Sequence, residues 1–292
     1  MRNTLEIRSV RPIWALIVVT LIACGKRTAS IPAATPAEAW ATVWSDEFDG
    51  PAGARIDTTI WRYDVTDGCN RGLCGWGNNE KEYYLSSPAN IAVNGNGQLM
   101  IVARRAPDGL HCFYGPCLYT SAKITTRGTM FVEPGRVEAR IKLPTGQGLW
   151  PAFWMLGERC MEAPWPGCGE IDIMENKGSQ PSTTSSAVHG PGYSGKTPLA
   201  HAHKIARGNL SDAFHTFAVE WDSVQVRFFV DGIPHYRVTR GEVQRYGRYV
   251  FDQAFYLVLN LAVGGTFDGD PQSDAIFPAT MLVDYVRVYK RR

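Results

Sequence analysis

The segment GEIDIMENKG, residues 169–178, sets three carboxylates, Glu170, Asp172 and Glu175, among isoleucine and methionine residues. This mixture of apolar and acidic residues fits a β-strand, on which side chains i and i+2 share a face. Burying an ionised carboxylate is costly unless it is paired, so three acids this close together indicate chemistry rather than packing. Two neighbouring carboxylic acids are the minimum needed to hydrolyse a glycosidic bond. A half-exposed strand carrying three solvated acids is the plainer alternative.

The spacing of the three acids predicts a β-bulge. Glu170 and Asp172 share a strand face, but strict alternation would put Glu175 on the opposite face. One extra residue near Ile173 and Met174 would return Glu175 to the face of the other two acids. Bulges often re-aim side chains beside active sites, so we expect the three carboxylates to converge.

The rest of the chain reads as strands separated by Gly, Pro, Asn and Asp. Residues 135–143 alternate apolar and charged side chains, and residues 224–230 also alternate before Asp231-Gly232 turns the chain into 233–238. No segment has a long amphipathic helical period, so the pattern predicts an all-β sandwich. The other strand-like runs are residues 99–104, 256–262 and 281–289.

Residues 170–175 resemble the bulged catalytic motif, E-x-D-x-x-E, of glycoside hydrolase family 16. The resemblance extends from about Trp44 to Tyr289 and implies a β-jelly roll of two curved antiparallel sheets with a concave substrate cleft. Within the family, the chain is most similar to the laminarinases, the endo-β-1,3-glucanases. The stretches that carry this similarity are GWGNNEKEYY (75–84), GRVEARIKLPTGQGLWPAFWMLG (135–157), VHGPGYSG (188–195), LNLAVGGTFDGDP (259–271) and MLVDYVRVY (281–289).

The resemblance implies a retaining, endo-acting hydrolase of β-1,3-glucosidic bonds in laminarin-like glucans, with no cofactor for catalysis. It makes Glu170 the nucleophile and Glu175 the general acid/base. We assign Asp172, between them, to orienting Glu170 and to tuning the titration of the pair. The alternatives are a mixed-linkage β-1,3-1,4-glucanase, an agar-type galactan hydrolase, a transglycosylase and a non-catalytic β-glucan-binding protein.

Aromatic and amide side chains are expected to bind the glucan, because sugar rings present apolar faces and their hydroxyls need polar partners. Trp150 and Trp154 are four residues apart and share a face on an unbulged strand, and Trp165 shortly precedes the catalytic segment. Core packing is the alternative for each tryptophan, as a structural role is for a lone histidine. The residues expected to bind substrate, several of them by resemblance, are Asn78, Asn79, Trp150, Trp154, Trp165, His189 and Asn260.

Asp284 is a further acid on a strand, sharing its expected face with Leu282 and two valines. An acid on an apolar face needs a partner. Relatives in the family often bind a structural calcium ion through an aspartate here and backbone oxygens near the start of the domain. The resemblance makes Glu47 and Gly97 the other candidate ligands, and oxygen ligands suit calcium. A hydrogen bond from a loop backbone is the alternative.

The N-terminus predicts export. Arginines precede an apolar run over residues 13–23 that is short for a membrane span, and LIACG (21–25) resembles a bacterial lipobox. We therefore expect lipidation of Cys24 and, because Gly25 follows it, an outer-membrane lipoprotein facing the periplasm or the cell surface. An ordinary signal peptide is the alternative. The expected parts are a lipoprotein signal peptide (1–23), a lipidated tether (24–40) and one catalytic domain (41–292).

Seven cysteines leave six once Cys24 carries lipid. The six fall into three close pairs in Gly- and Pro-rich stretches, so we predict three local disulfides, with free thiols as the alternative. The whole chain has a net charge of +2, all of it accounted for by the signal region. A mature chain near neutrality, with no basic stretch, argues against nucleic acid and is compatible with a neutral polysaccharide; we expect a monomer. The expected pairs are Cys69/Cys74, Cys112/Cys117 and Cys160/Cys168.

Overall fold

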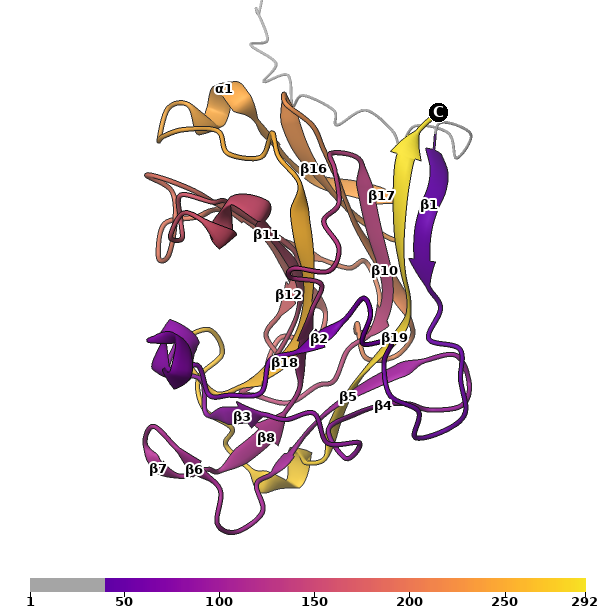
Figure 1. The fold of residues 1–292 in the computed structure, drawn as a ribbon, viewed down its shortest axis with the longest axis vertical. Coiled ribbons are helices and arrows are strands. Elements are labelled where there is room, and N and C mark those ends of the chain that lie inside the picture. The colour runs from indigo at the N-terminus through magenta and orange to yellow at the C-terminus, as the bar shows by residue number, and fades with distance from the viewer. Residues whose placement is uncertain (1–39) are drawn as a thin grey trace, which may run out of the picture. The chain divides into compact units, whose positions relative to one another are not determined.

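The computed structural model describes residues 40–292, which fold into two large β-sheets with very little helix (Figure 1). The predicted signal peptide and its lipidation site, Cys24, lie outside the described residues. The tether was expected to reach residue 40, but Trp40 already pairs with Arg291 in a sheet, so the folded domain begins earlier than predicted. Among the described residues, no helix is long and apolar enough to cross a bilayer.

The larger sheet has ten strands and contains both the first and the last strand of the described chain. All the pairs within it are antiparallel except β3 with β8, which are parallel. Its order is β17 (Ile233–Thr239), β16 (Gln225–Val230), β15 (His215–Trp221), β10 (Arg136–Lys142), β19 (Ala279–Arg291), β5 (Leu99–Arg105), β8 (Tyr119–Ser121) and β3 (Glu82–Tyr84), with β1 (Trp40–Asp46) beside β19 and β4 (Ile91–Val93) beside β5.

The smaller sheet has seven antiparallel strands and carries the segment of three acids as β12. Its order is β14 (Leu199–Lys204), β13 (Thr183–His189), β12 (Glu170–Asn176), β11 (Leu149–Gly157), β18 (Phe255–Val263), β9 (Lys123–Thr125) and β2 (Arg62–Tyr63). The remaining elements are the hairpin β6 (His111–Cys112) and β7 (Gly115–Pro116), the helix α1 (Arg240–Val243) and the 3₁₀ turns η2 (Cys69–Arg71), η3 (Cys74–Gly77), η4 (Glu158–Met161) and η5 (Asp274–Ile276).

The core lies between the two sheets, and the predicted alternation explains how it forms. On β10, Val137, Ala139 and Ile141 are fully buried while their neighbours remain partly exposed. Burying one valine- or leucine-sized side chain is worth about 1.5–3 kcal/mol, so this register is strongly favoured over one shifted by a single residue. The hairpin is also confirmed: Asp231 and Gly232, with φ of 51° and 74°, join β16 to β17. The fold is the expected all-β jelly roll.

Two histidines, His201 and His203, mark the outer edge of the smaller sheet. Both lie on β14, the edge strand of the smaller sheet, where they pair with Ser186 and Thr184 of β13. The ring of His203 lies 4.8 Å from that of His235, a buried residue of β17. The run LAHAHK carries no run of large apolar residues to mark it as a strand, because β14 lies at an edge and is largely exposed.

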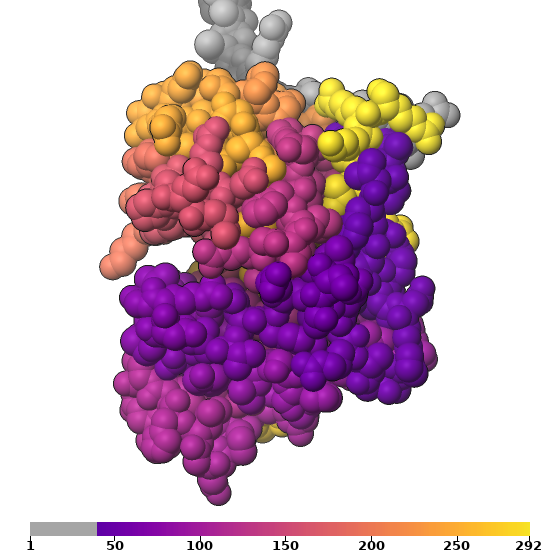
Figure 2. Space-filling model, viewed as in Figure 1, coloured from indigo at the N-terminus to yellow at the C-terminus, as the bar shows by residue number. Residues whose placement is uncertain are grey.

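The side of the smaller sheet turned away from the core is bordered by the loops that contain η2–η3 and η4 (Figure 1). Figure 2 shows the surface hollowed between these two loops, which are coloured purple and red. In the ribbon view, β11, β12 and β18 lie between these two loops and the larger sheet (Figure 1). This side of the sheet therefore faces the hollow.

Candidate active site

The predicted bulge is present in β12. Asp172 pairs with Trp154 of β11, and Glu175 pairs with Ala152, so three steps along β12 match only two along β11. The register shifts at Ile173, where β12 holds one residue more than its neighbour. Because paired residues in an antiparallel sheet share a face, Glu175 returns to the face of Asp172, as the spacing predicted.

The same register gathers the predicted binding residues of this sheet on one face. Trp150 belongs to this face as well, since β11 pairs with β18 without a shift over its whole length. Three rows of paired residues cross the sheet from β13: His189–Glu170–Leu156–Tyr256, then Ala187–Asp172–Trp154–Val258–Thr125, then Ser185–Glu175–Ala152–Asn260–Lys123.

Hydroxyl groups of β13 hold the bulge from the core side. Ser186 is fully buried, and its Oγ donates a 2.8 Å hydrogen bond to the carbonyl of Ile173, the extra residue. Thr184 Oγ1 donates a 3.1 Å bond to the carbonyl of Glu175. A bulge interrupts the ladder, and a buried carbonyl left without a donor costs about 1–3 kcal/mol. Ser186 therefore supports the backbone that aims Glu175.

We expect Ser186→Ala to lower the free energy of unfolding by about 1–3 kcal/mol, because the Ile173 carbonyl loses its donor. We also expect kcat on laminarin to fall about tenfold with KM little changed, because a displaced acid/base weakens the chemical step more than binding. Val188→Ala, a cavity mutation on the same strand, is the control: it should lose stability and keep kcat. Equal kcat in wild type and Ser186→Ala would show that the hydroxyl does not position Glu175.

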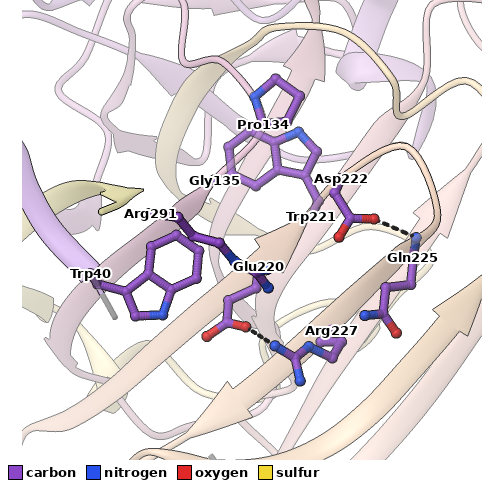
Figure 3. A pocket seen from close by; sticks show the side chains of 9 residues that line it. All are labelled: Trp40, Pro134, Gly135, Glu220, Trp221, Asp222, Gln225, Arg227 and Arg291. Carbon is purple, nitrogen blue, oxygen red and sulfur yellow. Dashed lines mark hydrogen bonds and ion pairs between the residues drawn. The ribbon is translucent and has the colours of Figure 1, made fainter. Parts of the chain in front are cut away.

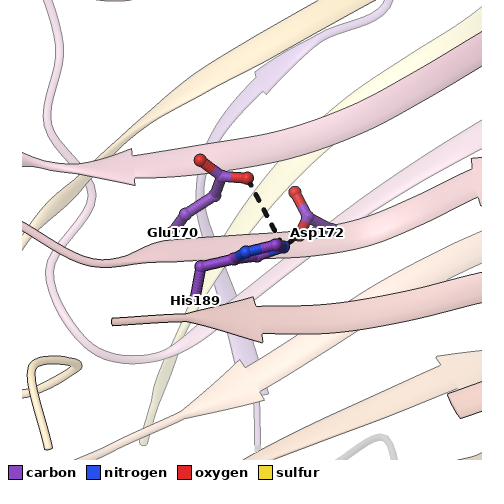
Figure 4. A group of neighbouring side chains, drawn as sticks. All are labelled: Glu170, Asp172 and His189. Carbon is purple, nitrogen blue, oxygen red and sulfur yellow. Dashed lines mark ion pairs between the residues drawn. The ribbon is translucent and has the colours of Figure 1, made fainter. Parts of the chain in front are cut away.

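The side chains of Glu170, Asp172 and His189 lie close together (Figure 4). His189 lies opposite Glu170 on β13. Its Nε2 is 3.1 Å from Asp172 Oδ2 and 3.8 Å from Glu170 Oε1. The predicted site histidine therefore contacts the carboxylate that was assigned an assisting role, and it stands beside the predicted nucleophile.

Burial raises the pKa of all three acids. The pKa of Glu170 rises to about 8 through desolvation and then the charge of Asp172, while the charge of His189 lowers it. Desolvation raises the pKa of Asp172 to about 7, against a hydrogen bond with Glu170 that lowers it. Desolvation and the charges of Asp172 and Glu170 hold the pKa of Glu175 well above its usual range. A protonated Glu175 suits a general acid, whereas Glu170 must lose its proton to attack.

Asp172→Asn should move both limbs of the pH profile of kcat/KM toward lower pH. Removing a negative charge makes ionisation of Glu170 and Glu175 easier, so the pKa of each falls. The acidic limb follows Glu170 and the alkaline limb follows Glu175, and a shift of about one pH unit is expected for a lost like charge at this range. Profiles of wild type and variant on one substrate measure it. Limbs that stay in place or move upward would contradict the electrostatic role.

Two predicted tryptophans are tied directly to the polar groups of this face. Trp150 Nε1 donates a 3.0 Å hydrogen bond to Glu175 Oε1, and its ring stacks on Phe267 at 4.6 Å. Trp154 Nε1 donates a 2.7 Å bond to Asn260 Oδ1. Both tryptophans are only partly buried. Phe267 was not identified as a site residue from the sequence. A single phenylalanine in the segment GGTFDGD gives no signal of its own.

The third tryptophan, Trp165, lies at the rim. It belongs to the loop closed by the Cys160–Cys168 disulfide, it is 46% exposed, and its ring centroid is 6.0 Å from that of His189. A hydrogen bond from its side chain helps to lower the pKa of Glu170. The other two predicted disulfides, Cys69–Cys74 and Cys112–Cys117, are also present.

The two asparagines of the loop GWGNNE, Asn78 and Asn79, have different partners. Asn78 Nδ2 donates a 3.0 Å hydrogen bond to Glu80 Oε1, and Tyr84 Oη donates a 3.3 Å bond to the other oxygen of Glu80. Tyr84 also receives a 3.1 Å bond from Asn260 Nδ2, which links the loop to the row of Glu175. Asn79 is exposed and bonds Lys81 instead. Asn78 thus belongs to the network of the site, and Asn79 does not.

Lys123 of β9 is a site residue that sequence reasoning missed. It is only 7% exposed, and its ammonium lies 3.6 Å from the ring centroid of Trp76 and 4.9 Å from that of Trp154. Cations are attracted to the faces of aromatic rings at these distances. Desolvation lowers the pKa of Lys123, while the charges of Asp64 and Glu80 raise it. A lysine on a three-residue strand gives no signal in the sequence, because lysine usually lies in water.

Asp284 was expected to share a strand face with Val286 and Val288, and this prediction is wrong. A second bulge, in β19, turns Val286 and Val288 into the core while Asp284 stays on the partly exposed face. There its carboxylate accepts a 2.7 Å hydrogen bond from Arg140. The Glu47 carboxylate is held by Arg287. Gly97 does lie beside the Glu47 carbonyl: a Cβ added to it would be 3.8 Å from that oxygen.

A separate pocket of about 160 Å³ lies where β1 and the end of β19 meet β15 and β16 (Figure 3). Trp40, Arg291 and Glu220 are among its lining residues. Glu220 already accepts hydrogen bonds from Arg136 and Arg227. The pocket contains none of the three acids, so it plays no part in the candidate active site.

The comparisons with known proteins agree with this geometry. The profile of "Glycosyl hydrolases family 16" matches residues 78–287. The β-glucanase of Rhodothermus marinus is 40% identical over 86% of this chain and 85% of its own. The laminarinase catalytic domain of Thermotoga maritima is 43% identical, with a TM-score of 0.81 over 87% of this chain and 99% of that one. The endo-β-1,3-glucanase of Pyrococcus furiosus is 41% identical, with a TM-score of 0.82 over 90% of this chain and 99% of that one.

Proposed function

This chain belongs to glycosyl hydrolases family 16, and we propose that it hydrolyses internal β-1,3-glucosidic bonds of laminarin-like glucans with retention of configuration. One observation carries the chemistry: the bulge in β12 brings Glu175 to the face of Glu170 and Asp172. The relatives named β-glucanase, laminarinase and endo-β-1,3-glucanase support the substrate class.

The proposed reaction has two displacements. In the first, the ionised carboxylate of Glu170 attacks the anomeric carbon while Glu175 gives its proton to the glycosidic oxygen, which leaves with the rest of the chain. In the second, Glu175 takes a proton from water, and the resulting hydroxide displaces Glu170 from the sugar. Two inversions at the anomeric carbon restore the β configuration, and no cofactor takes part.

Asp172 and His189 would help Glu170 to reach its reactive state. Glu170 starts with a raised pKa, so its proton must move to a neighbour before it can attack. Asp172 shares its strand face, and His189 lies beside both. The shared proton can rest on this group while Glu175 keeps its own, so the titration belongs to the group rather than to single residues.

The other side chains of this face would hold the glucan. The partly exposed rings of Trp150, Trp154 and Trp165 offer apolar surfaces for sugar rings. The network of Asn78, Glu80 and Asn260 offers donors and acceptors for hydroxyls. These substrate contacts stay predictions.

The test is digestion of laminarin, lichenan, agarose and carboxymethyl-cellulose by the wild-type protein, followed by chromatography of the products. We expect oligosaccharides of several lengths from laminarin and little release from agarose or carboxymethyl-cellulose. Faster release from lichenan would favour the mixed-linkage enzyme, and release from agarose the galactan hydrolase. Binding of laminarin without new reducing ends would favour a glucan-binding protein; transfer products longer than the substrate would indicate transglycosylation.

Structural calcium stays a prediction that rests on the family resemblance. The carboxylate of Asp284 already has a partner, because it accepts a hydrogen bond from Arg140. If Asp284 and the carbonyls of Glu47 and Gly97 bind calcium, EDTA should lower the melting temperature by about 5 °C, and added calcium should restore it. An unchanged melting temperature would leave the ion pair with Arg140 as the whole role of Asp284.

We also propose export as an outer-membrane lipoprotein, supported by the LIACG sequence around Cys24 and by three disulfides, which form in oxidising compartments. In a Gram-negative host the wild-type chain should fractionate with the outer membrane, and Cys24→Ser should release it into the soluble periplasmic fraction. Wild-type protein found in the soluble fraction would contradict the anchor. Sedimentation of the Cys24→Ser protein would test the expected monomer.

A further inference from the structure

We propose that Glu170, Asp172 and His189 form a binding site for a divalent transition-metal ion, and that the bound ion blocks hydrolysis. The inference rests on the proposed function, because it concerns the regulation of the same acids. The nucleophile and its two neighbours would thus have a second role, as metal ligands.

The donor atoms have the separations that one small ion requires. Each residue offers one nitrogen or oxygen, and the three atoms lie within 4.8 Å of one another. His189 Nε2 is 3.1 Å from Asp172 Oδ2 and 3.8 Å from Glu170 Oε1. Tetrahedral zinc with bonds of about 2.0–2.2 Å sets its ligand atoms about 3.3–3.6 Å apart. The two separations from His189 are within about 0.5 Å of this range, and side-chain rotations of about 1 Å would bring the most distant pair of donor atoms onto one ion.

One buried oxygen, Oδ2 of Asp172, supports an ion at this place. Asp172 is 4% exposed, and its Oδ2 has no hydrogen-bond partner in the described structure, although His189 Nε2 lies 3.1 Å away. Figure 4 shows the side chains of Glu170, Asp172 and His189 turned toward one another, as ligands of one ion would be.

Charge and ligand type favour the same class of ion. Within residues 40–292, neither Glu170 nor Asp172 forms a salt bridge with lysine or arginine. A divalent cation would neutralise two buried carboxylates that lack such a partner. One imidazole with two carboxylates is a ligand set used by zinc and related metals, whereas calcium and magnesium prefer oxygen alone.

The site is also open on the substrate side, which explains why an ion would inhibit. The side chain of Glu170 is 17% exposed, so a water molecule can complete four-coordination from the cleft. An ion bound to Glu170 would occupy the oxygen that must attack the sugar. Metal and substrate should therefore exclude each other.

Calorimetric titration of the full chain with zinc chloride at neutral pH tests the site. We expect one ion per chain in the wild type and at least about tenfold weaker binding in His189→Gln. If His189→Gln fails to fold, Asp172→Asn replaces it and should also bind zinc at least about tenfold more weakly than the wild type. The matched control is the double variant His201→Gln/His203→Gln, which removes two of the three histidines that lie together around His235; it should bind zinc as the wild type does.

Two competition experiments complete the test. Laminari-oligosaccharide should raise the apparent dissociation constant for zinc, and zinc should inhibit laminarin hydrolysis with an inhibition constant equal to that dissociation constant, reversibly with EDTA. Wild-type affinity in His189→Gln, loss of binding in the His201/His203 double variant, or binding indifferent to oligosaccharide would overturn the inference. Zinc binding at His189 in a protein that cleaves no glucan would instead refute the proposed function alone.

Discussion

Glu170→Gln should lower kcat on laminarin by at least about 10⁴-fold, because an amide cannot form the covalent intermediate. Glutamine has nearly the same shape, so the melting temperature should hold or rise: the variant removes a buried acid whose pKa is raised by desolvation. Reducing-end release and thermal melts measure the two quantities.

The control for this variant is Glu162→Gln, which alters an exposed glutamate in the loop between Cys160 and Cys168. It should keep wild-type kcat. Activity in Glu170→Gln within tenfold of the wild type would remove Glu170 from the nucleophile role, even if Glu175 proved essential.

Glu175→Ala should lower kcat by about 10²–10⁴-fold, the usual contribution of a general acid/base, and sodium azide should restore turnover of an aryl β-glucoside of laminaribiose. The aryl group leaves without protonation, so the covalent intermediate still forms on Glu170. Azide then attacks without needing a base and yields a β-glycosyl azide. Trp150 donates its indole hydrogen to Glu175, so it should keep the emptied position accessible to a small anion.

Mass spectrometry and NMR of the product decide this second prediction. A β-glycosyl azide assigns the acid/base to Glu175 and the nucleophile to another residue. An α-glycosyl azide would mean that azide displaced the aryl group directly from the position of the removed side chain, which would make Glu175 the nucleophile and Glu170 the acid/base. Absence of rescue, with the variant folded, would contradict the assignment.

The bulge could be predicted because side-chain alternation is a strict rule that the three acids break. Once Glu170, Asp172 and Glu175 had to share a face, the extra residue had to lie at Ile173 or Met174, and the register shows it there. The shared face of Trp150 and Trp154 followed from the same rule, because β11 is unbulged against β18. Local periodicity therefore predicted the arrangement within single strands.

Contacts between strands could not be predicted in the same way. Asp284 was misplaced because its bulge leaves no broken pattern of acids to reveal it. Lys123 and Phe267 enter the site only because β9 and the segment after β18 are brought there by the sheet. The hydrogen bond from Ser186 to Ile173 joins two strands through the core side. Such contacts depend on register across the sheet, which a single sequence does not display.

The division of labour between Glu170 and Glu175 rests on the family resemblance and on the environment of Glu175. Burial and the charges of Asp172 and Glu170 hold the pKa of Glu175 well above its usual range, which favours the protonated form that a general acid needs. Desolvation and the charge of Asp172 also raise the pKa of Glu170. The nucleophile role of Glu170 is therefore assigned by the family resemblance.

Proton NMR of laminarin hydrolysis, recorded from the first turnovers, tests the central claim most directly. Two displacements through Glu170 release new reducing ends as the β anomer, which then mutarotates to the equilibrium mixture. The account predicts that β-anomer signals appear first and α-anomer signals grow in later. Initial release of the α anomer, or no release from β-1,3-linked glucan at all, would contradict it.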